Sequence, residues 1–143
     1  MTLVVDASVL VAAAVDSGAN GRWAESLLVD RALLAPHLLP VEVCNVLRRL
    51  EASGKLDRLE AASALADCNA LEIELLPFAP FAERVWSLRD NLSSYDAWYV
   101  AIAERFSAEC ATLDRRLARA NGPTCRFVLP ARGGAEQPQR GRP

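Results

Sequence analysis

Four acidic side chains share one kind of position, because each lies directly before a predicted helix or in its first turn. They are Asp6, Glu42, Asp96 and Asp114. If the fold gathers them, four negative charges repel one another and at least one pKa has to rise, a conflict that a bound cation removes. Oxygen ligands without a nearby His or Cys favour Mg²⁺ or Mn²⁺ over zinc. Such a site is typical of phosphate-ester hydrolysis, which is the chemistry we expect.

Each acid also has a purely structural interpretation. Ser93-x-x-Asp96 matches a helix-capping signature, and Glu42 in a first turn complements the helix dipole. Asp6 and Asp114 can cap the helices that follow them. Taken one at a time, capping explains each acid at least as well as catalysis does. The catalytic interpretation therefore depends on whether all four converge.

Alternating strands and helices are expected to bring the acids to one edge. Short apolar, often β-branched runs predict strands at 3–5, 32–35, 73–76, 110–113 and 126–129. Helices are predicted between them, beginning near residues 7, 21, 40, 58, 81, 95 and 115. This alternation indicates an α/β fold with a mainly parallel central sheet, and ligands bind at the carboxyl ends of such strands.

Length and composition favour one soluble domain. The chain has 143 residues, of which 52% are hydrophobic and 24% charged. We expect the domain to span 1–130 and residues 131–143, which contain no apolar side chain larger than alanine, to form a disordered tail. The net charge of −2 gives no general attraction to nucleic acid. Without a signal-like or membrane-length apolar run, the protein is expected in the cytoplasm.

Two further expectations concern the core. Helical spacing predicts that the apolar face of the fourth helix consists of Leu59, Ala62, Leu65 and Ala66. The four cysteines contain no C-x-x-C pair, which argues against a zinc site. Three of them lie in apolar surroundings and are expected in the core, namely Cys44, Cys110 and Cys125.

The acids lie in four segments whose order and spacing match a known family. The segments are LVVDAS with Asp6, LLPVEVCNVLRR with Glu42, LSSYDAWYVAIAE with Asp96 and ATLDRRLA with Asp114. From residue 3 to about residue 129 the chain resembles a PIN-domain ribonuclease, and within that family a VapC-type toxin of a prokaryotic toxin–antitoxin pair. Any one segment alone is weak, whereas all four in order are fairly specific.

The resemblance implies a fold, a cofactor and partners. The fold would be a PIN-like three-layer α/β/α sandwich, commonly found as a homodimer. The matching acidic quartet would hold one or two Mg²⁺ or Mn²⁺ ions and hydrolyse RNA phosphodiester bonds, and a small VapB-type antitoxin would occlude the groove. Three polar residues would stand beside the acids: Ser8 and Thr112 through their hydroxyls, and Asn45 as a partner on the helical face of Glu42.

Several side chains near the acids are candidates for holding RNA. Phosphates could be held by four arginines, Arg48, Arg49, Arg115 and Arg116, although solvated helix faces and ion pairs explain each of them equally simply. Trp98 and Tyr99 have rings that stack on bases, but Tyr99 shares a face with Asp96 where core packing is favoured. The apolar segment 78–86 and the Trp98 region are candidates for a dimer interface.

Two other classes of protein need residues that this chain lacks at the required positions. A haloacid-dehalogenase-like phosphatase needs a second Asp where this chain has Ser8, and a response-regulator receiver needs a Lys near its last strand, whereas Lys55 is the only lysine. Both are disfavoured. A non-catalytic interaction module with a PIN-like fold stays open as the alternative, because an intact acidic quartet argues against it without excluding it.

Overall fold

The centre of the molecule is a five-stranded, wholly parallel sheet. The computed structural model describes residues 1–132 and places the strands in the order β3-β2-β1-β4-β5. The strand bounds are β1 Thr2–Val5, β2 Ala32–Pro36, β3 Ile73–Leu76, β4 Glu109–Ala111 and β5 Phe127–Val128. All five strands lie where the apolar runs predict them, and the parallel sheet is confirmed.

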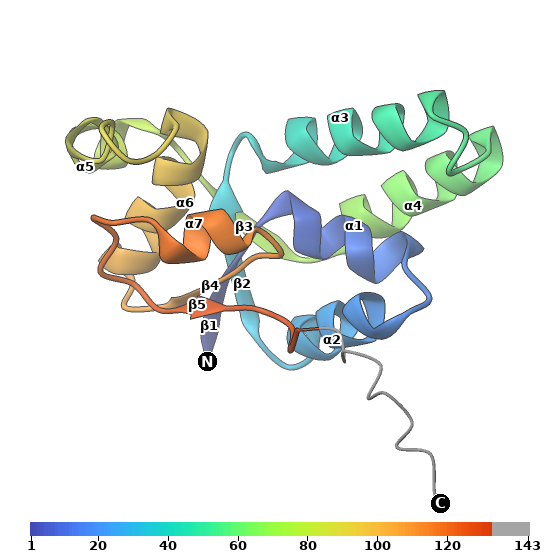
Figure 1. Ribbon diagram of the computed structural model, residues 1–143, viewed down its shortest axis with the longest axis horizontal. Helices are drawn as coiled ribbons and strands as arrows, with labels where there is room; N and C mark the ends of the chain where they lie inside the picture. The colour runs from blue at the N-terminus through green and yellow to red at the C-terminus, as the bar shows by residue number, and fades with distance from the viewer. Residues whose placement is uncertain (133–143) are drawn as a thin grey trace, which may run out of the picture.

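Helices separate the strands and cover both faces of the sheet. They are α1 Ala7–Val15, α2 Ala19–Leu28, α3 Leu39–Ala52, α4 Arg58–Ala70, a short 3-10 turn η1 Ala79–Phe81, α5 Ala82–Ser87, α6 Ser94–Arg105 and α7 Arg115–Arg119. Helix α6 contacts β1, β2 and β4, whereas α1 packs with α2, α3 and α4. Figure 1 shows the sheet running between these two groups of helices, so the three-layer α/β/α architecture is confirmed.

Strand β1 is central because it is apolar on both faces. Leu3, Val4 and Val5 are fully buried, as expected for a parallel strand covered on both sides. Val4 stands opposite Leu34 of β2 on one side and Cys110 of β4 on the other. The chain order reverses at β1, so the gap between the carboxyl ends of β1 and β4 is the topological switch point where such sheets bind ligands.

Several helix ends follow their sequence signals. Asp57 caps α4 in a reciprocal capping box with Glu60. At the end of α3 the chain turns through Gly54, whose φ of 77° favours glycine. Pro40 lies in the first turn of α3, where its missing N–H costs no helical hydrogen bond.

The predicted core face of α4 is wrong. Leu59 is 75% exposed, and the buried residues of this helix are Ala64 and Cys68, with Leu65 partly buried. The helix is rich in alanine, so its own hydrophobic pattern is weak, and packing against α1 and α3 decides which face is buried. Of the cysteines expected in the core, Cys110 is buried, Cys125 is partly buried and Cys44 is exposed.

One ion pair ties three distant segments together on the α5–α6 side of the sheet. The Arg84 guanidinium donates to both oxygens of Glu104, through Nε to Oε2 at 2.7 Å and through Nη2 to Oε1 at 3.0 Å. Arg84 Nη2 also donates to the carbonyl of Gly122 at 3.0 Å, and the backbone N–H of Thr124 donates to Glu104 Oε1 at 2.8 Å. This network joins α5 and α6 to the segment between α7 and β5.

The predicted tail lies almost wholly outside the described residues, which end at residue 132. Among the described residues, none of the helices has both the length and the apolar character that a membrane crossing requires.

Candidate active site

The two acids that follow strands meet at the switch point, and both cap helices. Asp6 follows β1, and its Oδ1 accepts a hydrogen bond from the backbone N–H of Ser8 at 3.1 Å. Asp114 follows β4, and its Oδ1 accepts from the backbone N–H groups of Arg116 at 2.9 Å and Leu117 at 3.3 Å. The capping interpretation is therefore confirmed for both, and it leaves the second oxygen of each carboxylate out of the cap.

Two hydroxyls connect the ends of β1 and β4. Thr112 is completely buried, and its Oγ1 donates to Asp6 Oδ2 at 2.7 Å while it accepts from the backbone N–H of Asp114 at 3.0 Å. Ser8 Oγ accepts from the backbone N–H of Leu113 at 3.2 Å. Because the Asp114 N–H already occupies a lone pair of Thr112, the hydroxyl proton is directed at Asp6. Both hydroxyls lie beside the acids, as the resemblance implies.

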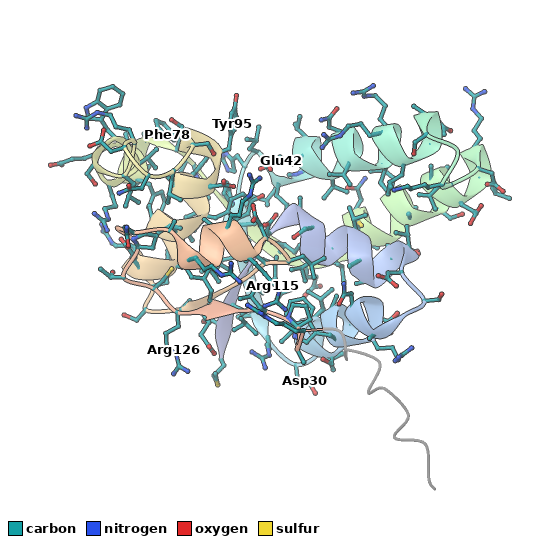
Figure 2. All side chains as sticks on the ribbon, viewed as in Figure 1. Asp30, Glu42, Phe78, Tyr95, Arg115 and Arg126 are labelled. Atoms are coloured by element: carbon teal, nitrogen blue, oxygen red, sulfur yellow. The ribbon has the colours of Figure 1, made fainter. Side chains whose placement is uncertain are left out.

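The other two acids come from the first turns of long helices. Glu42 lies in the first turn of α3, and Asp96 lies in the first turn of α6, where its backbone N–H donates to Ser93 Oγ at 3.2 Å. Glu42 Oε1 accepts a hydrogen bond from the hydroxyl of Tyr99 at 3.0 Å. Figure 2 shows Glu42 at the beginning of α3, on the side that faces α6.

Two of the acids, Glu42 and Asp96, have a raised pKa. Burial raises the pKa of Glu42, and the charges of Asp6 and Asp96 raise it further, although the Tyr99 hydrogen bond opposes them. Burial also raises the pKa of Asp96, followed by the charges of Asp6 and Asp114, against the opposing effects of Ser93 and Arg116. Two of the four acids therefore have the raised pKa that crowding predicts, and the charge of Arg116 opposes the shift of Asp96.

The carboxylates lie at the carboxyl edge of the sheet, but they do not form a closed set of metal ligands among the described residues. Among the described residues, no three His, Cys, Asp or Glu side chains are arranged as a ready-made metal-binding group. The donors that surround the switch point are nevertheless carboxylate and hydroxyl oxygens, which is the set that hard divalent cations prefer.

Most of the remaining predicted site residues contact partners other than the four acids. Asn45 is exposed, and its Oδ1 accepts from Arg48 Nε at 3.2 Å and Nη2 at 3.0 Å, which engages both of them with each other rather than with Glu42. Arg49 is exposed in the last turn of α3. Arg115 donates to the carbonyl of Pro130 at 2.8 Å. Of the four arginines, only Arg116 acts on an acid of the cluster.

The aromatic candidates for base stacking are occupied by packing. The ring of Trp98 meets that of Phe78 edge to face, with centroids 5.3 Å apart and planes at 83°. Tyr99 is 2% exposed. The expectation that this face of α6 belongs to the core is confirmed, but the polar end of Tyr99 reaches Glu42, a contact that sequence reasoning missed. Its signal was the spacing of three residues from Asp96, which places both on one helical face.

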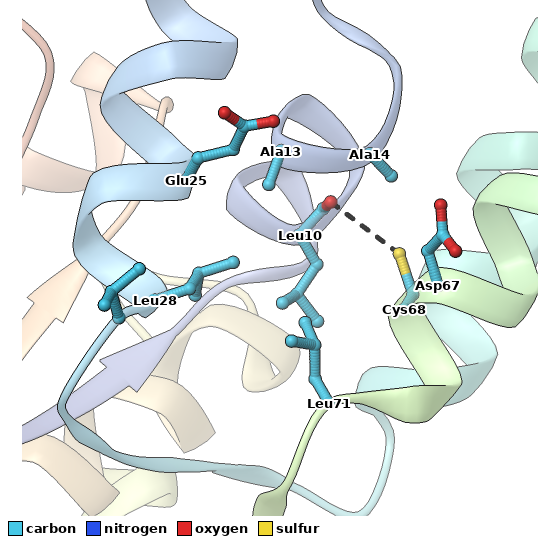
Figure 3. A pocket seen from close by; sticks show the side chains of 9 residues that line it. Leu10, Ala13, Ala14, Glu25, Leu28, Asp67, Cys68 and Leu71 are labelled. Carbon is cyan, nitrogen blue, oxygen red and sulfur yellow. Dashed lines mark hydrogen bonds between the residues drawn. The ribbon is translucent and has the colours of Figure 1, made fainter.

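A separate cavity lies away from the acids. It has a volume of about 430 Å³ between α1, α2 and α4, and Leu10, Leu28 and Leu71 give it apolar walls. Figure 3 shows Glu25 and Asp67 at its sides and the contact from Cys68 Sγ to the carbonyl of Leu10, at 3.7 Å. Burial raises the pKa of the Cys68 thiol to about 11, so this thiol stays protonated and unreactive at neutral pH.

Comparison with known proteins agrees with this architecture. A family model described as PIN domain matches residues 3–123. The chain is 35% identical over 127 residues to ribonuclease VapC9 of Mycobacterium tuberculosis, which covers 89% of this chain and 97% of that protein. Among solved structures, PAE2754 from Pyrobaculum aerophilum is 28% identical with a TM-score of 0.62, covering 82% of this chain and 78% of that one.

A third match concerns the fold alone. The crystal structure of VapBC2 from Rickettsia felis, bound to a DNA fragment from its promoter, aligns with a TM-score of 0.63 at 14% identity. The alignment covers 92% of this chain and 100% of that one. With the acids at the switch point, the matched family model and a VapC relative covered almost end to end, this chain belongs to the PIN-domain family and, within it, to the VapC proteins.

Proposed function

We propose that this protein is a metal-dependent endoribonuclease that acts as the toxin of a VapBC-type toxin–antitoxin pair in the cytoplasm. One observation carries the proposal: at the switch point the charges of Asp6 and Asp96 help burial to raise the pKa of Glu42, and those of Asp6 and Asp114 help burial to raise the pKa of Asp96. A folded protein tolerates such repulsion when a cation normally offsets it. The relative named ribonuclease VapC9 supports RNA as the substrate.

The residues present fit a divalent ion. Asp6, Glu42, Asp96 and Asp114 would hold Mg²⁺ or Mn²⁺, because every donor in the cluster is a hard oxygen. When bound, the ion would lower the pKa of a water molecule and stabilise charge on the phosphate.

The chain's own residues prepare this chemistry. Thr112 fixes the second oxygen of Asp6, and Ser8 joins the turn after β1 to the turn after β4, so the two strand ends keep their spacing. Arg116 lies close enough to Asp96 to hold a phosphate beside the acids.

The domain and its partners follow from the same proposal. Residues 1–130 would form the catalytic unit. We propose that a VapB-type antitoxin covers the acidic groove, in line with the shared fold of the Rickettsia felis VapBC2 complex, and that two copies of the chain associate.

The test is cleavage of total cellular RNA by the purified, antitoxin-free full chain. Cutting should require Mg²⁺ or Mn²⁺, stop with EDTA, and fall at least about 100-fold in Asp96→Asn, since the metal-bound charge is worth several kcal/mol. The matched control is Asp90→Asn, which makes the same change at an exposed position just before α6. Equal cutting by Asp96→Asn and the wild type would show that the site is wrong.

The alternative, a non-catalytic interaction module, predicts a different result. The protein would bind Mn²⁺ yet leave every RNA intact across metals and concentrations. The RNA pool should contain bacterial tRNA and ribosomal RNA, so that a single target RNA is not missed.

A further inference from the structure

The phenol of Tyr99 lies beside the acids, and it is not among the residues proposed to hold the metal ion or the RNA. Its side chain is buried at 2% exposure on α6, one helical turn after Asp96. Its hydroxyl donates to Glu42 Oε1 at 3.0 Å, across 57 residues of sequence. Among the described residues, no other hydrogen bond reaches the Glu42 carboxylate.

This bond links two helices that are anchored to different parts of the molecule. Helix α3 packs on α1 and α4, whereas α6 packs on α5 and on the sheet. Helix packing alone therefore does not set how the Glu42 carboxylate faces Asp6 and Asp96. The phenol does so, because its ring is immobilised in the core and its single O–H engages one carboxylate oxygen and leaves the other for a further ligand.

We propose that Tyr99 is a positioning residue that holds the Glu42 carboxylate toward Asp6 and Asp96, so that these acids take up a divalent cation together. The inference rests on the proposed function and deepens it. It gives Tyr99 no contact with RNA or with the ion. The aromatic ring contributes to the core, and the hydroxyl contributes to the site.

The first test removes only the hydroxyl. Tyr99→Phe keeps the ring in the core, and Tyr95→Phe is the matched control, because Tyr95 is the other tyrosine of the chain, lies on the same helix and is 62% exposed. Mn²⁺ affinity is measured by calorimetry on the metal-free full chain. We expect Tyr99→Phe to weaken Mn²⁺ binding about tenfold, at the low end of the range for partners of metal ligands, and Tyr95→Phe to leave it unchanged.

A double-mutant cycle shows whether Tyr99 acts through Glu42. In the Glu42→Ala background the hydroxyl has nothing to hold, so adding Tyr99→Phe should not weaken Mn²⁺ binding further. A second loss as large as the first would show that Tyr99 acts by another route and would overturn the inference. Circular dichroism of each variant, without metal, separates a loss of fold from a loss of affinity.

A second measurement uses the unsubstituted chain, in case Tyr99→Phe fails to fold. Labelling with 3-fluorotyrosine gives two ¹⁹F resonances, one for each tyrosine, and Tyr95→Phe assigns them. Titration with Mg²⁺ should shift the Tyr99 resonance and leave that of Tyr95 in place. A Tyr99 resonance that stays unchanged at saturating Mg²⁺ would overturn the inference.

The outcomes keep the two proposals apart. If the wild type binds Mn²⁺ and cuts RNA while Tyr99→Phe binds Mn²⁺ equally tightly, the inference about Tyr99 fails and the proposed function stands. If the wild type binds no Mn²⁺ and Asp96→Asn changes nothing, the metal site fails, and the inference fails with it.

Discussion

The molecule holds carboxylates in two opposite ways near the two ends of α6, with Asp96 in the first turn and Glu104 in the last. Glu104 has a full set of partners, since Arg84 donates to both of its oxygens and the Thr124 N–H donates as well. These donors lower the pKa of Glu104 despite its burial. At the switch point, burial and neighbouring charges instead raise the pKa values of Glu42 and Asp96.

Glu104 therefore stabilises the fold, whereas Glu42 and Asp96 stay available for a ligand. Glu104, which accepts three hydrogen bonds, two of them from a guanidinium, contributes to the stability of the native state. Carboxylates held near one another with few counter-charges cost stability until a ligand arrives. The comparison predicts that metal, pH and substitution act in opposite directions on the two clusters.

The largest expected effect is stabilisation by metal. A cation that binds only the folded protein adds about 2.7 kcal/mol to the free energy of unfolding at 100 times its Kd. Mn²⁺ should therefore raise the Tm of the wild type and of Arg84→Ala alike. It should raise the Tm of Asp96→Asn far less. Thermal unfolding in EDTA and in a Mn²⁺ series measures this, and an equal rise in Asp96→Asn would place the bound metal elsewhere.

The next effect is loss of the ion pair. Arg84→Ala should lower the free energy of unfolding by about 1 kcal/mol, the value for a well-ordered but partly solvated pair. Arg84→Lys keeps the charge but loses the fork that reaches both oxygens, so its loss should be smaller yet measurable. Urea unfolding measures both. RNA cleavage per folded molecule should stay at the wild-type level, and a large drop would mean that the two clusters are coupled.

The smallest effect is a difference in the sign of pH dependence. A carboxyl whose folded pKa is raised makes the native state less stable as pH increases, starting from its unfolded pKa of about 4. Glu42 and Asp96 should therefore lower stability in EDTA as pH rises from about 4 through their raised folded pKa values. Glu104, whose pKa is lowered, stabilises above its unfolded pKa, and this contribution is lost as pH falls through its folded pKa.

Substitutions distinguish these two contributions. Asp96→Asn should raise the Tm by a few degrees at neutral pH in EDTA and flatten the fall in stability above pH 4, because a repelling charge is gone. Arg84→Ala should leave that fall unchanged. Melting curves from pH 4 to 8 in EDTA show both. A lower Tm for Asp96→Asn would mean that its carboxylate stabilises the metal-free fold.

The sequence predicts the fold well because strands at the centre are apolar over their whole length. Leu3, Val4 and Val5 leave little choice but a buried strand, and Ser93 and Asp57 mark helix starts through local contacts. The α4 face is different, because an alanine-rich helix carries little pattern of its own. Its buried side depends on α1 and α3, which local sequence does not encode.

The candidate site shows the same division. The positions of Asp6 and Asp114 after strands can be predicted, since each caps the next helix within three residues. The spacing from Asp96 predicts the helical face of Tyr99, but not its hydrogen bond to Glu42, because that bond joins helices that pack on different partners. Helical spacing also predicts that Asn45 shares a face with Glu42, and in the structure the Oδ1 of Asn45 accepts from Arg48. The role of Asn45 beside Glu42 therefore stays a prediction.

The buried hydroxyl of Thr112 reaches back 106 residues to Asp6. During translation Asp6 leaves the ribosome long before Thr112, because nearly the whole domain is synthesised between them. A chain that ends between residues 96 and 111 carries Asp6, Glu42 and Asp96 but neither the hydroxyl that bonds Asp6 nor the fourth acid. If the proposed site requires all four acids, it is completed only after β4 has been synthesised, and shorter products would be inactive.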